Sequence, residues 1–184
     1  AVADVLLGRA DPGGRLPVTF PATSAQHPGL LNFPGDAGRV RYGEGIHVGH
    51  RAFDKLGLEP RFRFGHGLSY TTFEPGDVAA RRLADGGIEV TLVVANAGDR
   101  DGTEVVRVEA CGLGGVIRRL VGFSKVAIEV GGRSIVSVRV EAQHLRSWDP
   151  IGHRWVGADG AVALAVSGTG WERSLGVPEA ANGH

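Results

Sequence analysis

The chain has 184 residues and a mass of 19.2 kDa, a length that allows one or two domains. Its 20 basic and 20 acidic residues balance, which argues against nucleic-acid and anionic-membrane binders, since both need a basic excess. With 42% hydrophobic and 22% charged residues the composition is that of a folded protein, and 30 glycines with 9 prolines argue against a long helical bundle.

The first part of the chain predicts little regular structure. Residues 1–7 carry apolar side chains on one helical face and Gly8 is a suitable stop, so the last turns of a helix are expected there. Residues 15–21 are expected to be extended, because their prolines exclude a central antiparallel strand. A long irregular loop is expected over 22–41, and weak alternation over 46–53 predicts a short strand or a turn.

A period of two takes over from about residue 77 and predicts a series of short strands. Ile88, Val90 and Leu92 point to one face, for example, with polar residues between them. Gly131-Gly132 predicts a hairpin. The other expected strands are residues 103–110, 120–130, 134–140, 154–156, 161–167 and 171–177, with a turn at residues 147–149. Such spacing predicts an antiparallel sandwich of two sheets.

Three motifs, met in the same order, resemble a known family. They are residues 3–21 with ADVLLG and PGGRLPVTFP, residues 42–51 (YGEGIHVGHR) and residues 62–73 (FRFGHGLSYTTF). These stretches resemble the C-terminal α/β region of glycoside hydrolase family 3, the β-glucosidase and β-xylosidase family. In the second part, the stretches VANAG, GTEVV, LVGF and WD are similar to the family's fibronectin type III-like domain. The resemblance extends to about residue 177.

The resemblance implies a mainly β fold. A fibronectin type III-like antiparallel β-sandwich at residues 74–184 is expected to follow a remnant of an α/β sandwich domain at residues 1–73. The chain would then be the C-terminal part of a β-glucosidase-type hydrolase, an enzyme that releases terminal β-D-glucosyl residues from a β-linked glucoside or oligosaccharide when intact. The expected partner is the remainder of such an enzyme or another copy of the chain, with no nucleic acid, membrane or cofactor.

The catalytic carboxyl groups are expected to lie outside this chain. Members of the family carry the nucleophilic aspartate on an N-terminal barrel and the acid/base glutamate earlier in the α/β domain. Retaining hydrolysis needs two carboxyl groups about 5–5.5 Å apart, and no pair of acids in this sequence has a spacing that compels such a site. Residues 147–149 read Ser-Trp-Asp, which differs from the family's Ser-Asp-Trp nucleophile motif. The expected role is scaffolding without a catalytic residue.

Glu44 is the single weak catalytic candidate, and Tyr42 beside it is a weak candidate for substrate binding. The functional interpretation places Glu44 at the sugar site of the intact enzyme. The structural interpretation pairs it with an arginine such as Arg41 or Arg51. We favour the structural interpretation, because a paired carboxylate is kept ionised and does not donate a proton.

Trp148 and Trp155 are weak candidates for substrate binding, because aromatic rings stack on the apolar faces of sugars. In a sandwich such residues more often lie in the core or at a sheet edge, and this interpretation is favoured. His47, His50 and His66 are close in sequence but lack the spacing and the carboxylate partners of a metal site, so no metal is expected.

Two other classes of function stay open. One is a stand-alone β-sandwich module that binds carbohydrate or protein, with the first part wrapped around the sandwich. The other is a minimal glycosidase that uses Glu44 and a second acid such as Asp36 or Asp54. A truncated α/β remnant would expose apolar surface, so we expect self-association or partial disorder within residues 1–60.

The remaining sequence signals are weak. The single cysteine, Cys111, has no partner for an internal disulfide and is expected to be half-buried. No apolar run reaches the roughly 18 residues of a membrane span, and residues 1–8 lack the basic leader of a secretory signal. The sequence leaves the cellular location open.

Overall fold

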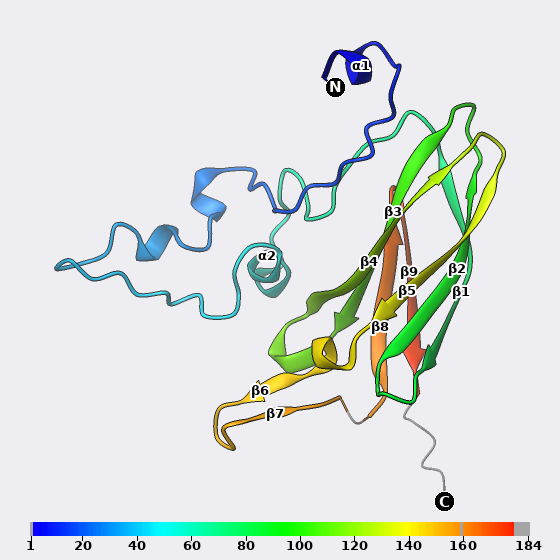
Figure 1. Ribbon diagram of the computed structural model, residues 1–184. Coiled ribbons are helices and arrows are strands. Elements are labelled where there is room, and N and C mark those ends of the chain that lie inside the picture. Colours follow the sequence, from blue (N-terminus) through cyan, green and yellow to red (C-terminus); the bar gives the residue numbers. More distant parts are fainter. Residues whose placement is uncertain (1, 159, 179–184) are drawn as a thin grey trace, which may run out of the picture.

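The computed structural model describes residues 2–158 and 160–178, and it has two parts (Figure 1). Residues 73–177 form antiparallel β-sheets, whereas the residues before them form short helices joined by long connections. The chain is therefore mainly β, as the sequence predicts.

The N-terminal part begins with one short helix, α1 (Val2–Leu6). Gly8 has a φ of +68°, the left-handed conformation that ends a helix, so the predicted stop is confirmed. The irregular loop predicted over residues 22–41 is also confirmed. Its only helical features among the described residues are two turns of 3-10 helix, η1 (Ser24–Gln26) and η2 (Leu30–Asn32).

The strand or turn predicted over residues 46–53 is wrong for the second half of that range, which begins helix α2 (His50–Leu56). Two apolar residues of the helix, Ala52 and Phe53, are buried. Gly57 ends the helix with a φ of +63°. Burial of one face of this short helix outweighs the weak alternation in the sequence, because tertiary packing overrides local propensity.

Two antiparallel sheets face each other in the sandwich. The 3-stranded sheet has the order β1-β2-β5 and consists of β1 (Phe73–Arg82), β2 (Ile88–Asn96) and β5 (Arg133–Val140). The 4-stranded sheet has the order β4-β3-β8-β9 and consists of β3 (Gly102–Cys111), β4 (Arg118–Ile128), β8 (Val162–Gly168) and β9 (Trp171–Val177). The short turns η3 (Leu113–Gly115) and η4 (Ala142–Leu145) lie in connections.

The core lies between the sheets and is built from alternate residues of the strands. Ile88, Val90 and Val94 of β2 are completely buried, as are Val106 and Val108 of β3. Full burial of such a side chain stabilises the fold by about 1.5–3 kcal/mol relative to leaving it exposed. The period of two in the sequence therefore identifies the core face correctly.

The connection between β4 and β5 is not the hairpin that Gly131-Gly132 predicts. β4 pairs with β3, whereas β5 pairs with β2, so the chain crosses here from one sheet to the other. Gly131 has a φ of +68°, and the carbonyl of Gly132 accepts a hydrogen bond of 3.0 Å from the amide of Asn96. Two glycines allow a tight turn in either case, and only the pairing of the strands distinguishes a hairpin from a crossing.

Two further elements differ from the prediction. The strand β1 begins before residue 77, although Pro75 and Gly76 interrupt its alternation, and its register with β2 shifts between Pro75 and Val78. A proline is tolerated there because β1 lies at a sheet edge. The residues expected to form a turn are strand β6 (Ser147–Asp149), which pairs with β7 (Arg154–Val156).

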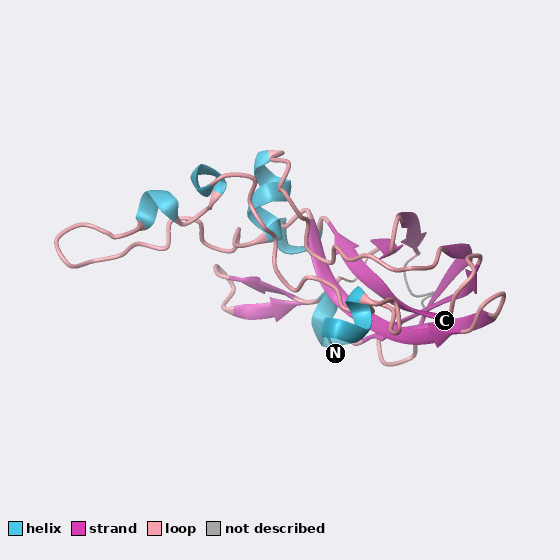
Figure 2. Cartoon of the chain, turned by 90° about the horizontal axis from the view of Figure 1, so that it is seen from above, coloured by secondary structure: helices cyan, strands magenta, loops and turns pink. Residues whose placement is uncertain are grey.

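Two segments project from the sandwich toward the same side (Figures 1 and 2). One is the arm, which we define as residues 20–48, and the other is the hairpin of β6 and β7. The arm exposes large apolar side chains, among them Leu31 with 96% of its surface accessible and Phe33 with 75%. The arm therefore has no hydrophobic core of its own.

Candidate functional site

The arm carries two of the candidates from the sequence. Tyr42 is 81% exposed. Glu44 is half-buried, and its carboxylate accepts a hydrogen bond of 2.6 Å from Asn32 Nδ2. In the described part of the chain Glu44 forms no ion pair with Arg41 or Arg51, so an amide takes the place of the arginine that the structural interpretation expected.

The acids considered as partners of Glu44 lie in other surroundings. Asp36 belongs to a turn that two backbone hydrogen bonds of 2.9 Å close with Arg39. Asp54 lies on α2.

The projecting hairpin carries the other two candidates. Trp148 and Trp155 are directly opposite each other in the register, and both are exposed. Their ring centroids are 5.6 Å apart at an interplanar angle of 70°, and the ring of His153 meets Trp148 edge-on at 6.5 Å. The two indoles therefore contact each other edge to face and do not form one flat platform.

The two parts of the chain are joined along the seam, which we define as the contact of residues 8–17 and 58–71 with the sandwich. Asp11 is one joint of the seam. Its Oδ1 accepts hydrogen bonds from the Ser69 hydroxyl at 2.7 Å and from the backbone amide of Tyr70 at 2.8 Å. Its Oδ2 accepts a hydrogen bond of 3.0 Å from the amide of Thr103 in β3. The Asp11 carboxylate thus links both N-terminal segments of the seam, residues 8–17 and 58–71, to the sandwich.

A buried ion pair forms the second joint of the seam. Glu104 of β3 is fully buried, and its Oε1 lies 3.2 Å from Nη2 of Arg15, whose side chain is only 6% exposed. Thr169 donates to Glu104 from its amide and its hydroxyl, each at 2.9 Å, and Trp171 Nε1 donates at 3.2 Å. A buried charge with this many partners fixes a unique arrangement and makes loss of one partner costly.

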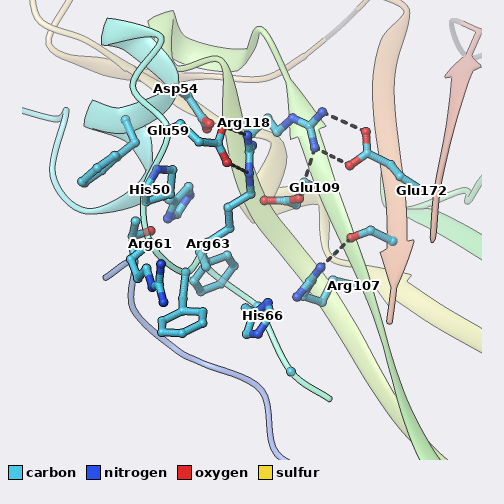
Figure 3. A pocket seen from close by; sticks show the side chains of 18 of the residues that line it. His50, Asp54, Glu59, Arg61, Arg63, His66, Arg107, Glu109, Arg118 and Glu172 are labelled. Atoms are coloured by element: carbon cyan, nitrogen blue, oxygen red, sulfur yellow. Dashed lines mark hydrogen bonds and ion pairs between the residues drawn. The ribbon is translucent and has the colours of Figure 1, made fainter. Parts of the chain in front are cut away.

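A cavity of about 450 Å³ opens at the seam (Figure 3). One of its walls is the outer face of the 4-stranded sheet, and the opposite wall is α2 with residues 58–67. Charged side chains of both signs line it, namely Asp54, Glu59, Arg61, Arg63, Arg107, Glu109, Arg118 and Glu172. None of the candidates Tyr42, Glu44, Trp148 and Trp155 is among the residues lining it.

A bidentate ion pair of the cavity joins two strands of one sheet. Arg118 of β4 donates two hydrogen bonds to Glu172 of β9, of 2.6 and 2.8 Å. These bonds raise the pKa of Arg118 above its ordinary value and lower the pKa of Glu172. Both charges are therefore held at neutral pH.

Three other groups of the cavity are shifted mainly by burial. Burial raises the pKa of Glu109, which is 6% exposed and lies 3.8 Å from the Arg118 guanidinium. Burial lowers the pKa of Arg107, whose Nη2 donates a hydrogen bond of 3.0 Å to the Ser167 hydroxyl. Burial also lowers the pKa of His50. In each case desolvation disfavours the charged form.

Sequence reasoning named His50, His66 and Asp54, which line this cavity, but not the charged residues of the sheet that form its other wall. Arg107 and Glu109 are two residues apart in a predicted strand whose apolar residues face the core, so their common position on the outer face was available from the alternation. The segment that covers them, α2 with residues 58–67, gave no such signal, because a short helix and an irregular loop have no period that locates their partner.

The described residues show neither a cluster of metal-ligating side chains nor a membrane-spanning helix. No group of three or more His, Cys, Asp and Glu side chains there could hold a metal ion. Cys111 is a free, half-buried thiol as expected, and burial raises its pKa. None of the described helices is long and apolar enough to cross a membrane.

Comparison with known families matches both parts of the chain. Residues 1–70 match the glycosyl hydrolase family 3 C-terminal domain, and residues 106–169 match a fibronectin type III-like domain. Curated relatives include probable β-glucosidase I of Aspergillus clavatus, 40% identical over 93% of this chain, and probable β-glucosidase J of Neosartorya fischeri, 38% identical over 96%. The chain spans 22% of the length of each of these relatives.

Solved structures agree with these matches. DesR, a β-glucosidase from Streptomyces venezuelae crystallised with D-glucose, is 35% identical and superposes on 97% of this chain with a TM-score of 0.92, while this chain covers 24% of DesR. β-Glucosidase 3B from Thermotoga neapolitana is 33% identical, with a TM-score of 0.85 over 97% of this chain and 26% of its own. The chain is therefore the C-terminal region of a glycosyl hydrolase family 3 protein, in which residues that match the family's C-terminal domain precede residues that match a fibronectin type III-like domain.

Proposed function

We propose that this chain is the C-terminal scaffold of a β-glucosidase whose preceding domains supply the nucleophile and the acid/base. In that enzyme terminal β-D-glucosyl residues are hydrolysed from β-linked glucosides. The observation that carries the proposal is the match to DesR, which extends over 97% of this chain and only 24% of the β-glucosidase. In this arrangement residues 1–73 end the α/β domain and residues 74–184 form the sandwich.

The seam supports a scaffolding role. The two joints at Asp11 and Glu104 attach the N-terminal part to β3, one of the inner strands of the 4-stranded sheet. Catalytic groups must be held within fractions of an ångström by rigid surroundings. A sandwich attached through buried charges is suited to holding the end of the α/β domain in place.

The arm supports the presence of a covering domain. Leu31, Phe33 and Tyr42 expose most of their surfaces, and exposed apolar patches mark interaction sites. We infer that the arm packs against the preceding domains and that Tyr42 and Glu44 border the sugar site there. Glu44 then positions a hydroxyl group instead of transferring a proton, and the Asn32 amide holds its carboxylate for that task.

An assay on an aryl β-glucoside tests the proposal. We expect turnover from the protein expressed together with the coding sequence that precedes Ala1, and only background from residues 1–184. Glu44→Gln in the longer protein is expected to raise KM more than it lowers kcat, because the carboxylate binds substrate without moving a proton.

Two results would overturn the proposal. Robust turnover by residues 1–184 that Glu44→Gln abolishes would identify a minimal glycosidase. An inactive longer protein, together with retardation of residues 1–184 in a β-glucan gel, would identify a stand-alone binding module instead.

A further inference from the structure

The cavity at the seam has the dimensions of a small-molecule site. Its volume of about 450 Å³ falls within the usual range for ligand pockets, about 300–1,000 Å³. Its walls come from segments far apart in the sequence, with His50 and Asp54 on one side and Arg107, Glu109 and Glu172 on the other (Figure 3). The cavity is therefore formed by the tertiary fold and not by any single loop.

Some of the charges in the cavity neutralise one another. Arg118 and Glu172 form a bidentate pair, and Arg63 pairs with Glu59 along the covering loop. These four side chains have their charges balanced without a ligand. Of the other four, Asp54 and Arg61 belong to the covering wall, and Glu109 and Arg107 lie side by side on the outer face of β3, at the base of the cavity.

Glu109 and Arg107 lack the partners that buried charges normally have. Among the described residues no group donates a hydrogen bond to the Glu109 carboxyl, and its ion pair with Arg118 is long at 3.8 Å. The Nε of Arg107 is buried without a hydrogen-bond partner in the described residues, and so is Nε2 of His50. Leaving such groups unmatched is destabilising, and more so when they are charged. A ligand in the cavity would supply a hydrogen-bond donor to the Glu109 carboxyl, which is the partly accessible group of this set.

The chemistry of these groups selects the ligand. An anion would pair with Arg107 but meet Glu109, and a cation would pair with Glu109 but meet Arg107 and Arg118. A hydroxyl group both accepts a hydrogen bond from a guanidinium and donates one to a carboxylate. Two adjacent hydroxyl groups could therefore bridge Arg107 and Glu109 without introducing charge.

Aromatic rings in the opposite wall fit the same ligand. Phe53, Phe62 and Phe64 line the cavity, and Phe64 stacks on His50 with ring centroids 4.6 Å apart. Such rings bind the apolar C–H faces of a sugar, while polar groups bind its edge. We propose that the seam cavity binds a neutral polyhydroxylated molecule with the size of one or two sugar rings.

The test is a titration of residues 1–184 followed by amide NMR, with D-glucose and cellobiose as neutral probes, succinate as the anion and putrescine as the cation. Since residues 1–184 are used alone, the result does not depend on the proposed hydrolysis. We expect saturable shifts for the lining glycines Gly65, Gly168 and Gly170 with a neutral probe, and none for Gly131, which lies outside the cavity. Probe concentrations reach about 100 mM, which detects Kd values in the millimolar range.

Variants locate the binding. Glu109→Gln and Arg107→Lys are each expected to weaken binding of the neutral probe by about tenfold, because each removes a hydrogen bond to a charged group. The control Glu89→Gln removes an exposed carboxylate that pairs with Arg81 in the other sheet, and it should leave the affinity unchanged. Circular dichroism checks that each variant is folded.

The titration of the unmodified chain decides the proposal even where a variant fails to fold. Absence of shifts at the lining glycines with both sugars would refute it. Binding of succinate or putrescine at these glycines without binding of a sugar would assign the cavity to a charged ligand and refute it as well. Unchanged affinity in folded Glu109→Gln and Arg107→Lys would show that the sugar binds elsewhere.

Discussion

Glu104 illustrates at the scale of one residue how the two parts of the chain are joined. The carboxylate comes from β3, whereas its cation, Arg15, comes from the extended segment near the start of the chain. The sequence contains both residues but no pattern that pairs them, because 88 positions separate them and neither belongs to a periodic contact. The buried pair is therefore a property of the folded chain that sequence reasoning could not supply.

Glu104→Gln should destabilise the chain by about 3 kcal/mol, because it leaves the Arg15 guanidinium buried without its counter-charge. Urea unfolding followed by tryptophan fluorescence measures this free energy. Glu89→Gln is the matched control, since it breaks an exposed pair worth less than about 1 kcal/mol. Equal losses in the two variants would show that the seam is not held by the buried pair.

Two glutamates of the seam cavity, Glu109 and Glu172, should respond to pH with opposite signs. The folded state holds the proton of Glu109 more tightly than the unfolded chain does, so stability falls as pH rises from the ordinary glutamate pKa through the raised one. The free energy of unfolding of Glu109→Gln, relative to the unmodified chain, should therefore increase over this window. Urea titrations at about pH 4 and about pH 8 measure the difference.

Glu172 provides the opposite case in the same cavity. The bonds from Arg118 lower its pKa, so its contribution is complete above the ordinary glutamate pKa and is lost as pH falls through the lowered one. The deficit of Glu172→Gln should therefore be largest at neutral pH and shrink in acid. A deficit that is independent of pH would contradict the assignment.

At the scale of elements, the accuracy of the sequence analysis follows the strength of the periodic signal. The core strands β2 and β3 were predicted because β2 alternates over its nine residues and β3 alternates over its first seven. Helix α2 and strand β6 were not, since seven and three residues give too few periods to separate helix, strand and turn. The arm was correctly expected to be irregular, but no pattern in it identifies what its exposed side chains contact.

Truncation of a leucine to alanine should lower the free energy of unfolding far more in the strands than on the arm. Leu164 of β8 is 1% exposed, and Leu164→Ala should cost about 3 kcal/mol from lost burial and the cavity that is left. Leu31→Ala on the arm should change the free energy of unfolding by less than about 0.5 kcal/mol. Thermal or urea unfolding checks both, and a large loss for Leu31→Ala would mean that the arm is packed.

At the scale of the whole molecule, apolar side chains of the arm lie outside any core, and the chain spans 22% of its curated relatives. We expect residues 1–184 to self-associate through the arm, because burying exposed apolar surface is favourable at about 25 cal/mol per Å². Sedimentation measurements should show oligomers that Leu31→Ser with Phe33→Ser reduces to monomers. The control Ile135→Ser, an exposed residue of β5, should not change the oligomers. A monomeric unmodified chain would contradict this expectation.

The joint at Arg15 has a practical consequence for anyone who wishes to isolate the fibronectin type III-like domain. A boundary drawn from homology near residue 73 would discard Asp11 and Arg15, and with them the groups that bond Thr103 and Glu104. The excised sandwich would then keep the Glu104 carboxylate without the Arg15 guanidinium that pairs with it. An expression boundary upstream of Asp11 keeps both residues. The smallest stable piece that contains the sandwich therefore includes residues of the preceding α/β part.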